Sequence, residues 1–144
     1  MEIRTFDRLT NRQLYEILKL RSQVFIVEQG GRYLDPDGVD CDSIHIFTQD
    51  GGGSVTGCIR VFPKEDEPGT VQLGRLVVRD RNRGLGRSLM EAARQVALEQ
   101  FHAKSLYLTG RRDALGFYKK CGYSVEAPGM VDGEVIYYHL RRNL

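Results

Sequence analysis

Tryptophan is absent from this sequence of 144 residues, and cysteine and proline are scarce, with three and four residues. The cysteines are odd in number and widely spaced, at Cys41, Cys58 and Cys121. Such a set does not form a disulfide framework, and no pair has the spacing of zinc ligands. We therefore expect reduced thiols in a reducing compartment and no metal centre.

Long apolar runs and a strong excess of charge are also missing. No stretch approaches the roughly 20 residues of a membrane-spanning helix, and the first residues lack the apolar segment of a secretion signal. The 21 basic and 19 acidic residues leave a formal net charge of +2, which gives little general attraction for nucleic acid. We expect one cytoplasmic domain over residues 1–144, with no nucleic acid or membrane partner.

The order of strand and helix patterns predicts a mixed α/β fold of the α+β type. Apolar residues at three- and four-residue steps predict one helix that starts at a capping box over residues 10–13 and carries its apolar face as far as Phe25. Similar patterns predict a second helix after Gly84 and a short third helix at residues 113–121. Strand patterns lie at residues 3–6, 43–48, 55–62, 71–78, 105–109, 123–125 and 135–140.

Residues 76–90 join an apolar strand to a basic turn that contains glycine, and then to a helix. The first N–H groups of a helix lack intrahelical partners and carry partial positive charge, and glycine lets an anion approach the backbone. Arginines at positions 79, 81, 83 and 87 add charge. We expect a diphosphate site here. A simple helix-capping turn remains an alternative, because the pattern is neither a Walker A loop nor a complete dinucleotide fingerprint.

A second motif, from Phe117 and Tyr118 to Gly122 and Tyr123, follows about thirty residues after the first. The Arg-x-x-Gly-x-Gly pattern of residues 81–86 and this segment together resemble the GNAT acetyltransferase superfamily. Residues 21–29, followed by Asp37, Asp40 and His45, resemble its ElaA-type branch. The resemblance covers essentially the whole chain. It implies a central, mostly antiparallel twisted sheet of six or seven strands with helices on both faces.

The resemblance also implies acetyl-CoA as co-substrate, with no metal. Main-chain groups of Leu76, Val77 and Val78 would pair with the pantetheine arm, and Phe117 would help to close the acyl site. Tyr118, whose phenol ordinarily has a pKa near 10, would donate a proton to the departing thiolate, unless it is a core aromatic residue. The residues that would hold the diphosphate are Arg81, Asn82, Arg83, Gly84, Leu85, Gly86, Arg87 and Ser88.

The acceptor would be a primary amine of a small molecule or peptide that attacks acetyl-CoA directly in a ternary complex. A base or a water chain must take the amine proton, and Glu28 and His45 are the candidates, although a surface carboxylate and a structural histidine are the alternatives. Arg21, Phe25 and Gln29 would lie on the acceptor side. Arg21 is centred on an apolar helix face and needs an anion, either from the substrate or from Asp37 or Asp40 as a structural pair.

The chain departs from the ElaA-type pattern at three places, so the acceptor identity does not carry over. The link between Val78 and Arg81 is about two residues shorter, Gly110-Arg111 stands where Ala-Gln is frequent, and Ile136 stands where histidine is usual. Two other functions remain open. One is an acyltransferase like the acyl-homoserine-lactone synthases, which share an Arg-x-x-Val-Phe helix, and the other is a non-catalytic module that binds coenzyme A. Monomer and homodimer are equally compatible with the sequence.

Overall fold

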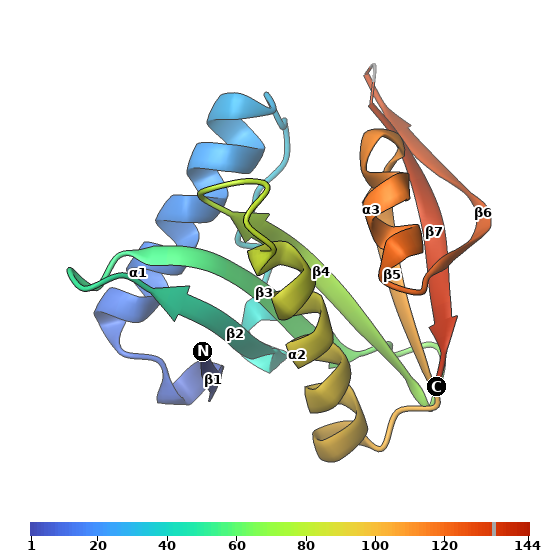
Figure 1. Cartoon of the computed structure of the whole chain (residues 1–144), viewed down its shortest axis with the longest axis horizontal. Helices are drawn as coiled ribbons and strands as arrows, with labels where there is room; N and C mark the ends of the chain where they lie inside the picture. Colours follow the sequence, from blue (N-terminus) through green and yellow to red (C-terminus); the bar gives the residue numbers. More distant parts are fainter. Residues whose placement is uncertain (134) are drawn as a thin grey trace.

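The computed structural model describes residues 1–133 and 135–144, and its strands form one seven-stranded sheet in the order β1-β2-β3-β4-β5-β7-β6 (Figure 1). Neighbouring strands are antiparallel except β4 and β5, which are parallel. The predicted mixed, mostly antiparallel sheet is therefore confirmed. The strands are β1 (Glu2–Thr5), β2 (Ile44–Gln49), β3 (Val55–Pro63), β4 (Thr70–Val78), β5 (Ser105–Arg111), β6 (Ser124–Asp132) and β7 (Val135–Asn143).

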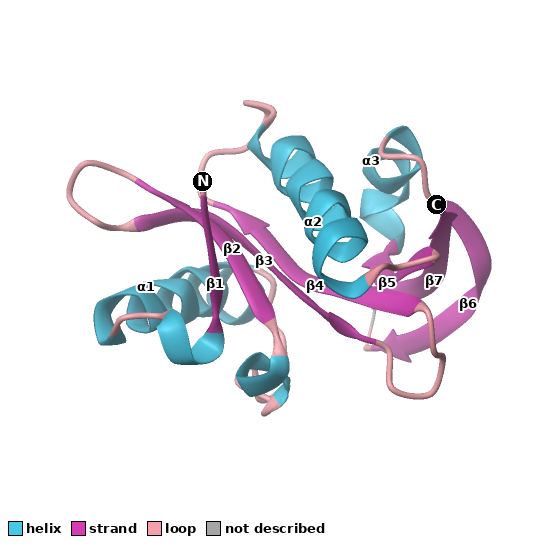
Figure 2. Cartoon of the chain, turned by 90° about the horizontal axis from the view of Figure 1, so that it is seen from below, coloured by secondary structure: helices cyan, strands magenta, loops and turns pink. Residues whose placement is uncertain are grey.

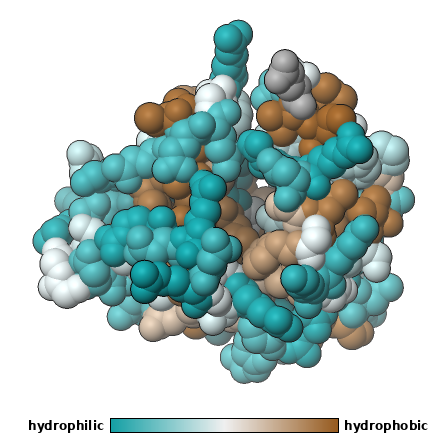
Figure 3. Space-filling view, turned by 45° about the horizontal axis from the view of Figure 1, so that its top comes forward, coloured by the Kyte–Doolittle hydropathy of each residue, from teal (hydrophilic) through white to brown (hydrophobic). Residues whose placement is uncertain are grey.

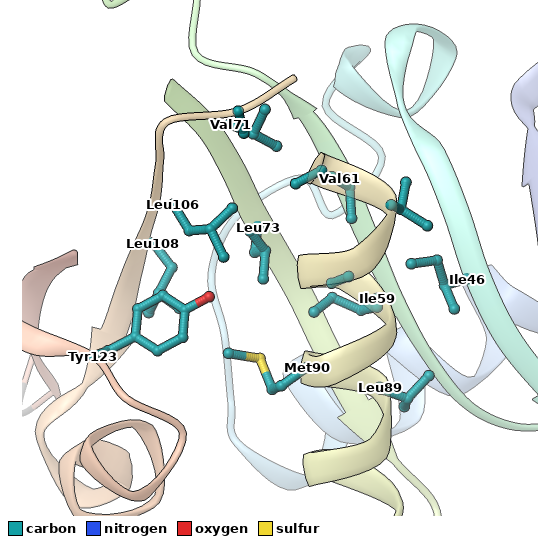
Figure 4. Close-up of a cluster of buried hydrophobic side chains, with 14 of the residues drawn as sticks. Ile46, Ile59, Val61, Val71, Leu73, Leu89, Met90, Leu106, Leu108 and Tyr123 are labelled. Atoms are coloured by element: carbon teal, nitrogen blue, oxygen red, sulfur yellow. The ribbon is translucent and has the colours of Figure 1, made fainter. Parts of the chain in front are cut away.

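Helices cover both faces of the sheet, as predicted. Helix α1 (Asn11–Arg21) lies on one face, and α2 (Leu85–Phe101) and α3 (Leu115–Lys120) lie on the other (Figure 2). Each face buries its own apolar cluster. Ile59, Leu73 and Leu106 pack beneath α2 (Figure 4), whereas Phe47 and Val77 pack beneath α1. Four short helical segments complete the chain: η1 (Phe6–Arg8), η2 (Ser22–Glu28), η3 (Val39–Asp42) and η4 (Arg112–Ala114).

The first helix begins as predicted but ends differently. Thr10 and Gln13 form the expected capping box, in which each side chain accepts a bond from the other residue's backbone N–H. The α-helix ends at Arg21, and η2 continues the chain as a π-helix, in which the Gln29 N–H donates to the Val24 carbonyl at 2.9 Å. The prediction of one regular helical face as far as Phe25 was wrong. The β-branched residues of η2 have stiff side chains that crowd a regular α-helix.

The last two strands are longer than the sequence pattern predicted. We expected strands at residues 123–125 and 135–140, but β6 covers Ser124–Asp132 and β7 covers Val135–Asn143. Pro128 and Gly129 lie inside β6, where the pairing register shifts twice. An edge strand tolerates these residues, because it lacks a partner on one side and bulges absorb the irregularity.

A glycine in β3 fixes the position of α2. A Cβ atom at Gly57 would lie 2.8 Å from Leu85 Cδ2, so a larger residue would push the helix away. Leu85 is the first residue of α2. The start of this helix is therefore held directly against the sheet, beside the end of β4 with which Gly57 is paired in register.

Candidate active site

Strands β4 and β5 pair over a short length and then diverge. Thr70 to Gln72 face Ser105 to Tyr107 in parallel register, and beyond these residues β5 pairs with β7 alone, as far as Arg111. The two strands separate toward their carboxyl ends (Figure 1). Among the residues that the structure describes, Leu76, Val77 and Val78 consequently have no strand partner on the β5 side, and their main-chain groups there are available to an extended ligand.

A bulge in β4 lies at the start of this divergence. Cys58 faces Val77 and Arg60 faces Gly74, so β4 contains one more residue than β3 between the two pairs. Arg75, inside the bulge, has a φ of 53°, a left-handed conformation that is costly for a residue other than glycine. The strand pattern of residues 71–78 did not predict this bulge, although an isolated glycine within a strand, Gly74, is a signal for one.

The turn between β4 and α2 has an exposed, amide-rich backbone. Asn82 and Gly84 have φ values of 62° and 78°, and Gly84 caps α2 without a side-chain hydrogen bond to the helix. The Ser88 hydroxyl donates to the Gly84 carbonyl at 3.1 Å and so leaves the first amides of the helix uncovered. This geometry fits an anionic group such as a diphosphate.

The arginines of this turn divide into two pairs. Arg79 contacts Asp50 and Asp80 at 3.1 and 3.3 Å, and Arg81 contacts Glu28 at 3.0 Å. Arg83 and Arg87 are exposed. The two arginines closest to the helix start are therefore the ones best placed to supply charge to an anion at its amides.

The second sequence motif packs against the first. A Cβ atom at Gly86 would lie 3.4 Å from the Phe117 ring, so α3 lies beside the start of α2. Tyr118 packs on β5, because a Cβ atom at Gly110 would lie 2.7 Å from its ring. Burial raises the pKa of Tyr118 to about 12. The structure thus brings Phe117 and Tyr118 to the side of the sheet where the glycine turn lies.

Glu28 and Gln29 form contacts with both diverging strands. Glu28 forms its ion pair with Arg81, just beyond β4, and the Gln29 side-chain oxygen accepts a hydrogen bond from Arg111, the last residue of β5, at 3.1 Å. Both contacts are long-range in sequence. The end of η2 therefore spans the opening between β4 and β5, on the face that α1 covers. Phe25 packs partly buried against the apolar cluster of that face.

His45 lies away from this opening. It is 2% exposed on β2, with β3 between it and β4, and its Nε2 lies 2.8 Å from the Asp40 carbonyl. Burial lowers the pKa of His45. This geometry favours the structural role over the role of catalytic base.

Arg21 also has a structural role, because it pairs with carboxylates of the protein itself. Its side chain is 1% exposed, and it donates to Asp35 at 2.9 Å and to Asp40 at 2.7 Å. Asp40 was one expected partner, whereas Asp37, the other, instead binds Arg60 at 2.7 and 2.8 Å. Arg75 adds an ion pair with Asp35 at 2.8 Å. This network fixes the loop of residues 31–42 against the sheet and supports the bulge.

Among residues 1–133 and 135–144, no group of three or more His, Cys, Asp or Glu side chains is arranged to hold a metal ion. Within the same residues, no helix is long and apolar enough to cross a membrane. The surface is hollowed between the part that carries α1 and the part that carries the β6–β7 hairpin (Figure 3).

A sheet that opens between β4 and β5, with an amide-rich turn and a tyrosine beside the opening, defines an acyltransferase of the GNAT type. The chain belongs to the acetyltransferase (GNAT) family, whose family model matches residues 11–123. It lies in the ElaA-like branch. Protein ElaA of Escherichia coli is 31% identical over 121 residues, which cover 81% of this chain and 78% of ElaA.

Solved structures agree with this assignment. The crystal structure of Escherichia coli ElaA has a TM-score of 0.89 at 26% identity and covers 99% of this chain and 97% of its own. An acyl-CoA N-acyltransferase from Pseudomonas aeruginosa has a TM-score of 0.88 at 29% identity, with 98% and 97% covered. An aminoglycoside 6'-N-acetyltransferase complexed with coenzyme A, at 17% identity and a TM-score of 0.75, shares the fold over 99% and 97% of the two chains.

Proposed function

We propose that this protein transfers the acetyl group of acetyl-CoA to a primary amine of a small-molecule or peptide acceptor, by direct attack in a ternary complex. One observation supports this proposal above the others. The unpaired edge of β4, the uncovered amides at the start of α2 and the Tyr118 ring all lie around the same opening of the sheet. A protein that binds an acyl thioester with a diphosphate and transfers its acyl group needs these three elements together.

Each element has a distinct task in donor binding. The amides of residues 84–86 and the exposed side chains of Arg83 and Arg87 bind the diphosphate through hydrogen bonds and charge. Main-chain groups of Leu76 and Val78 pair with the amides of the pantetheine arm. A strand N–H near Val78 donates to the thioester oxygen and stabilises the negative charge that develops on it.

The reaction forms one bond and breaks one. The amine nitrogen attacks the thioester carbonyl carbon, the carbon–sulfur bond breaks, and Tyr118 gives its proton to the departing sulfur. A phenol with a pKa of about 12 remains protonated at neutral pH and is ready for this step. The amine proton passes to Glu28 or to a water chain, and solvent returns a proton to Tyr118.

The ion pair between Glu28 and Arg81 couples these steps. Both side chains are more than half exposed, at 55% and 63%. A bound diphosphate attracts Arg81 and repels Glu28, so donor binding loosens the pair. The Glu28 carboxylate is then free to accept the proton of an amine that enters beside η2.

The proposal is tested by coenzyme A release, followed with a thiol reagent, across amino acids, polyamines, aminoglycosides and peptide amines. We expect release that depends on the amine. Tyr118→Phe should lower kcat roughly 100-fold and leave the acetyl-CoA dissociation constant unchanged, because general acid catalysis contributes about that much. Tyr15→Phe, on an exposed tyrosine of α1, is the matched control and should match the wild type. A protein that binds acetyl-CoA but releases no thiol with any amine would contradict the proposal.

A further inference from the structure

The two faces of the sheet border different sides of the opening between β4 and β5. Gly110 points toward Tyr118 and α3, so the next residue of β5, Arg111, projects from the opposite face. Its contact with Gln29 confirms this orientation. Since the donor groups lie on the face of α2 and α3, an acceptor approaches from the face of α1, where Arg111 lies. This assignment of the faces rests on the proposed function.

Arg111 is held in a fixed orientation but keeps donors free. Its Nε and Nη2 donate to the two Asp113 oxygens at 3.1 and 3.0 Å, and its Nη1 donates to Gln29 at 3.1 Å. A guanidinium has five N–H donors, so these contacts use three of them. The side chain is 28% exposed. Asp113 occupies the Nε–Nη2 side of the guanidinium, so a further carboxylate would accept from the two remaining N–H groups, on Nη1 and Nη2.

Two tyrosines lie near Arg111. Tyr137 is its register partner on β7 and projects from the same face. Tyr33, which is 39% exposed, lies under the Arg75 guanidinium at 5.3 Å. Both tyrosines contribute to the electrostatic environment of Arg111. Aromatic rings with polar tips beside an arginine form a wall for a small polar molecule.

The carboxylates around this wall are already paired. Glu28 binds Arg81, Asp113 binds Arg111, and the loop carboxylates bind buried or half-buried arginines. Asp113 and the loop carboxylates are therefore engaged with arginines, and Glu28, once donor binding frees it, takes the proton of the reacting amine. A second ammonium group of a polyamine or aminoglycoside would have to compete with these arginines for their carboxylates.

We propose that the acceptor carries a carboxylate close to its reacting amine, as amino acids do, and that Arg111 binds this carboxylate. Arg111 is then a specificity residue, which acts on acceptor binding and takes no part in the chemical step. An acceptor with several positive charges, which fold neighbours of low identity would suggest, would contradict this proposal.

The test compares amino acids with their decarboxylated amines: tyrosine with tyramine, and lysine with cadaverine. We expect wild-type kcat/KM to favour the amino acid by at least about tenfold, mainly through KM. Arg111→Gln should abolish the preference and keep the acetyl-CoA dissociation constant, whereas Arg112→Gln, on the exposed neighbour, should keep the preference. Arg111→Lys keeps the positive charge but lacks the planar set of donors of a guanidinium, so this variant should keep part of the preference for the amino acid.

The outcomes separate this inference from the proposed function. If tyramine and cadaverine are acetylated as well as or better than the amino acids, the inference is overturned and the transferase function stands. If acetyl-CoA binds and no amine reacts, both are overturned. The comparison on the wild-type protein needs no variant, so a failure of Arg111→Gln to fold leaves the test intact.

Discussion

At the scale of single residues, Gly110 determines how closely Tyr118 approaches the sheet. The absence of a side chain lets the tyrosine ring lie against the β5 backbone, at a distance where a methyl group would overlap it. Leu140 on β7 closes the same space from the other side, 3.0 Å from the place of that methyl group. The position of the phenol therefore depends on a residue that carries no chemistry itself.

Gly110→Ala should therefore displace the Tyr118 ring. We expect kcat to fall roughly tenfold or more and stability to fall by about 1–3 kcal/mol, as overpacked sites do. The control is Gly116→Ala in α3, where a methyl group meets no atom within 4 Å and improves helix propensity. Steady-state kinetics and urea unfolding of both variants check this. Equal kcat values in the two variants would contradict the placement of Tyr118.

Residue identity alone indicated some members of the site and not others. The motifs that contain Tyr118 and residues 81–88 could be recognised in the sequence, because they have fixed spacings on a strand, a turn and a helix, and the roles of these residues stay predictions. Arg111 was placed on the acceptor side only as a departure from the ElaA-type pattern and was given no role, and Tyr33 was not assigned, since its position depends on a loop without local periodicity. Arg21 was expected to need an anion. Arg21 binds Asp35 and Asp40 because of the way the loop of residues 31–42 folds.

At the scale of elements, an ionic network holds the loop of residues 31–42 against the sheet. Hydrogen bonds from Arg60 hold the pKa of Asp37 well below its usual range. Burial alone would raise the pKa of Asp40, but contacts with Arg21 and Arg60 outweigh burial and lower it. A carboxyl group with a lowered folded-state pKa stabilises the protein above its unfolded pKa of about 3.9, and this contribution is lost as the pH falls toward the folded value.

The free energy of unfolding should consequently decrease as the pH falls below about 4. Asp37→Asn should lower stability at pH 7 and flatten this acid dependence, because the variant has no carboxyl group to protonate at that position. Urea unfolding between pH 7 and pH 2 measures both effects. Asp42→Asn, on an exposed residue of η3, should retain the wild-type slope. An unchanged slope in Asp37→Asn would show that the Asp37 carboxylate contributes nothing to the acid dependence of stability.

The elements that the sequence predicted least well are those whose conformation depends on contacts with other parts of the chain. The apolar periodicity of α2 and the capping box of α1 are local signals, and both elements formed as expected. The π-helix η2, the bulge at Arg75 and the second half of β6 are irregular. The bulge and β6 depend on pairing with β3 and β7, which no local pattern specifies, and η2 departs from the α-helix that its apolar periodicity predicted.

At the scale of the whole molecule, the parallel junction of β4 and β5 organises the function. Antiparallel pairing on both outer sides of these strands keeps each half of the sheet intact while the two strands separate. Helices α2 and α3 lie on one face of the sheet and α1 on the other (Figure 2), so the proposed donor site lies on the first face and the proposed acceptor side on the second. The fold class was predictable from the sequence, whereas the donor site stays a prediction and the proposed acceptor side depends on the three-dimensional arrangement of both halves.

Isothermal titration of acetyl-CoA into the folded protein tests the central claim most directly. We predict one site per chain, a dissociation constant that rises as salt screens the diphosphate contacts, and at least a tenfold weaker constant for Arg83→Glu, which places a negative charge at the diphosphate. Arg94→Glu, on a half-buried residue near the middle of α2 and away from its start, should bind like the wild type. No heat of binding from well-folded wild-type protein, or equal affinities for the two variants, would contradict an acetyl-CoA site at this turn.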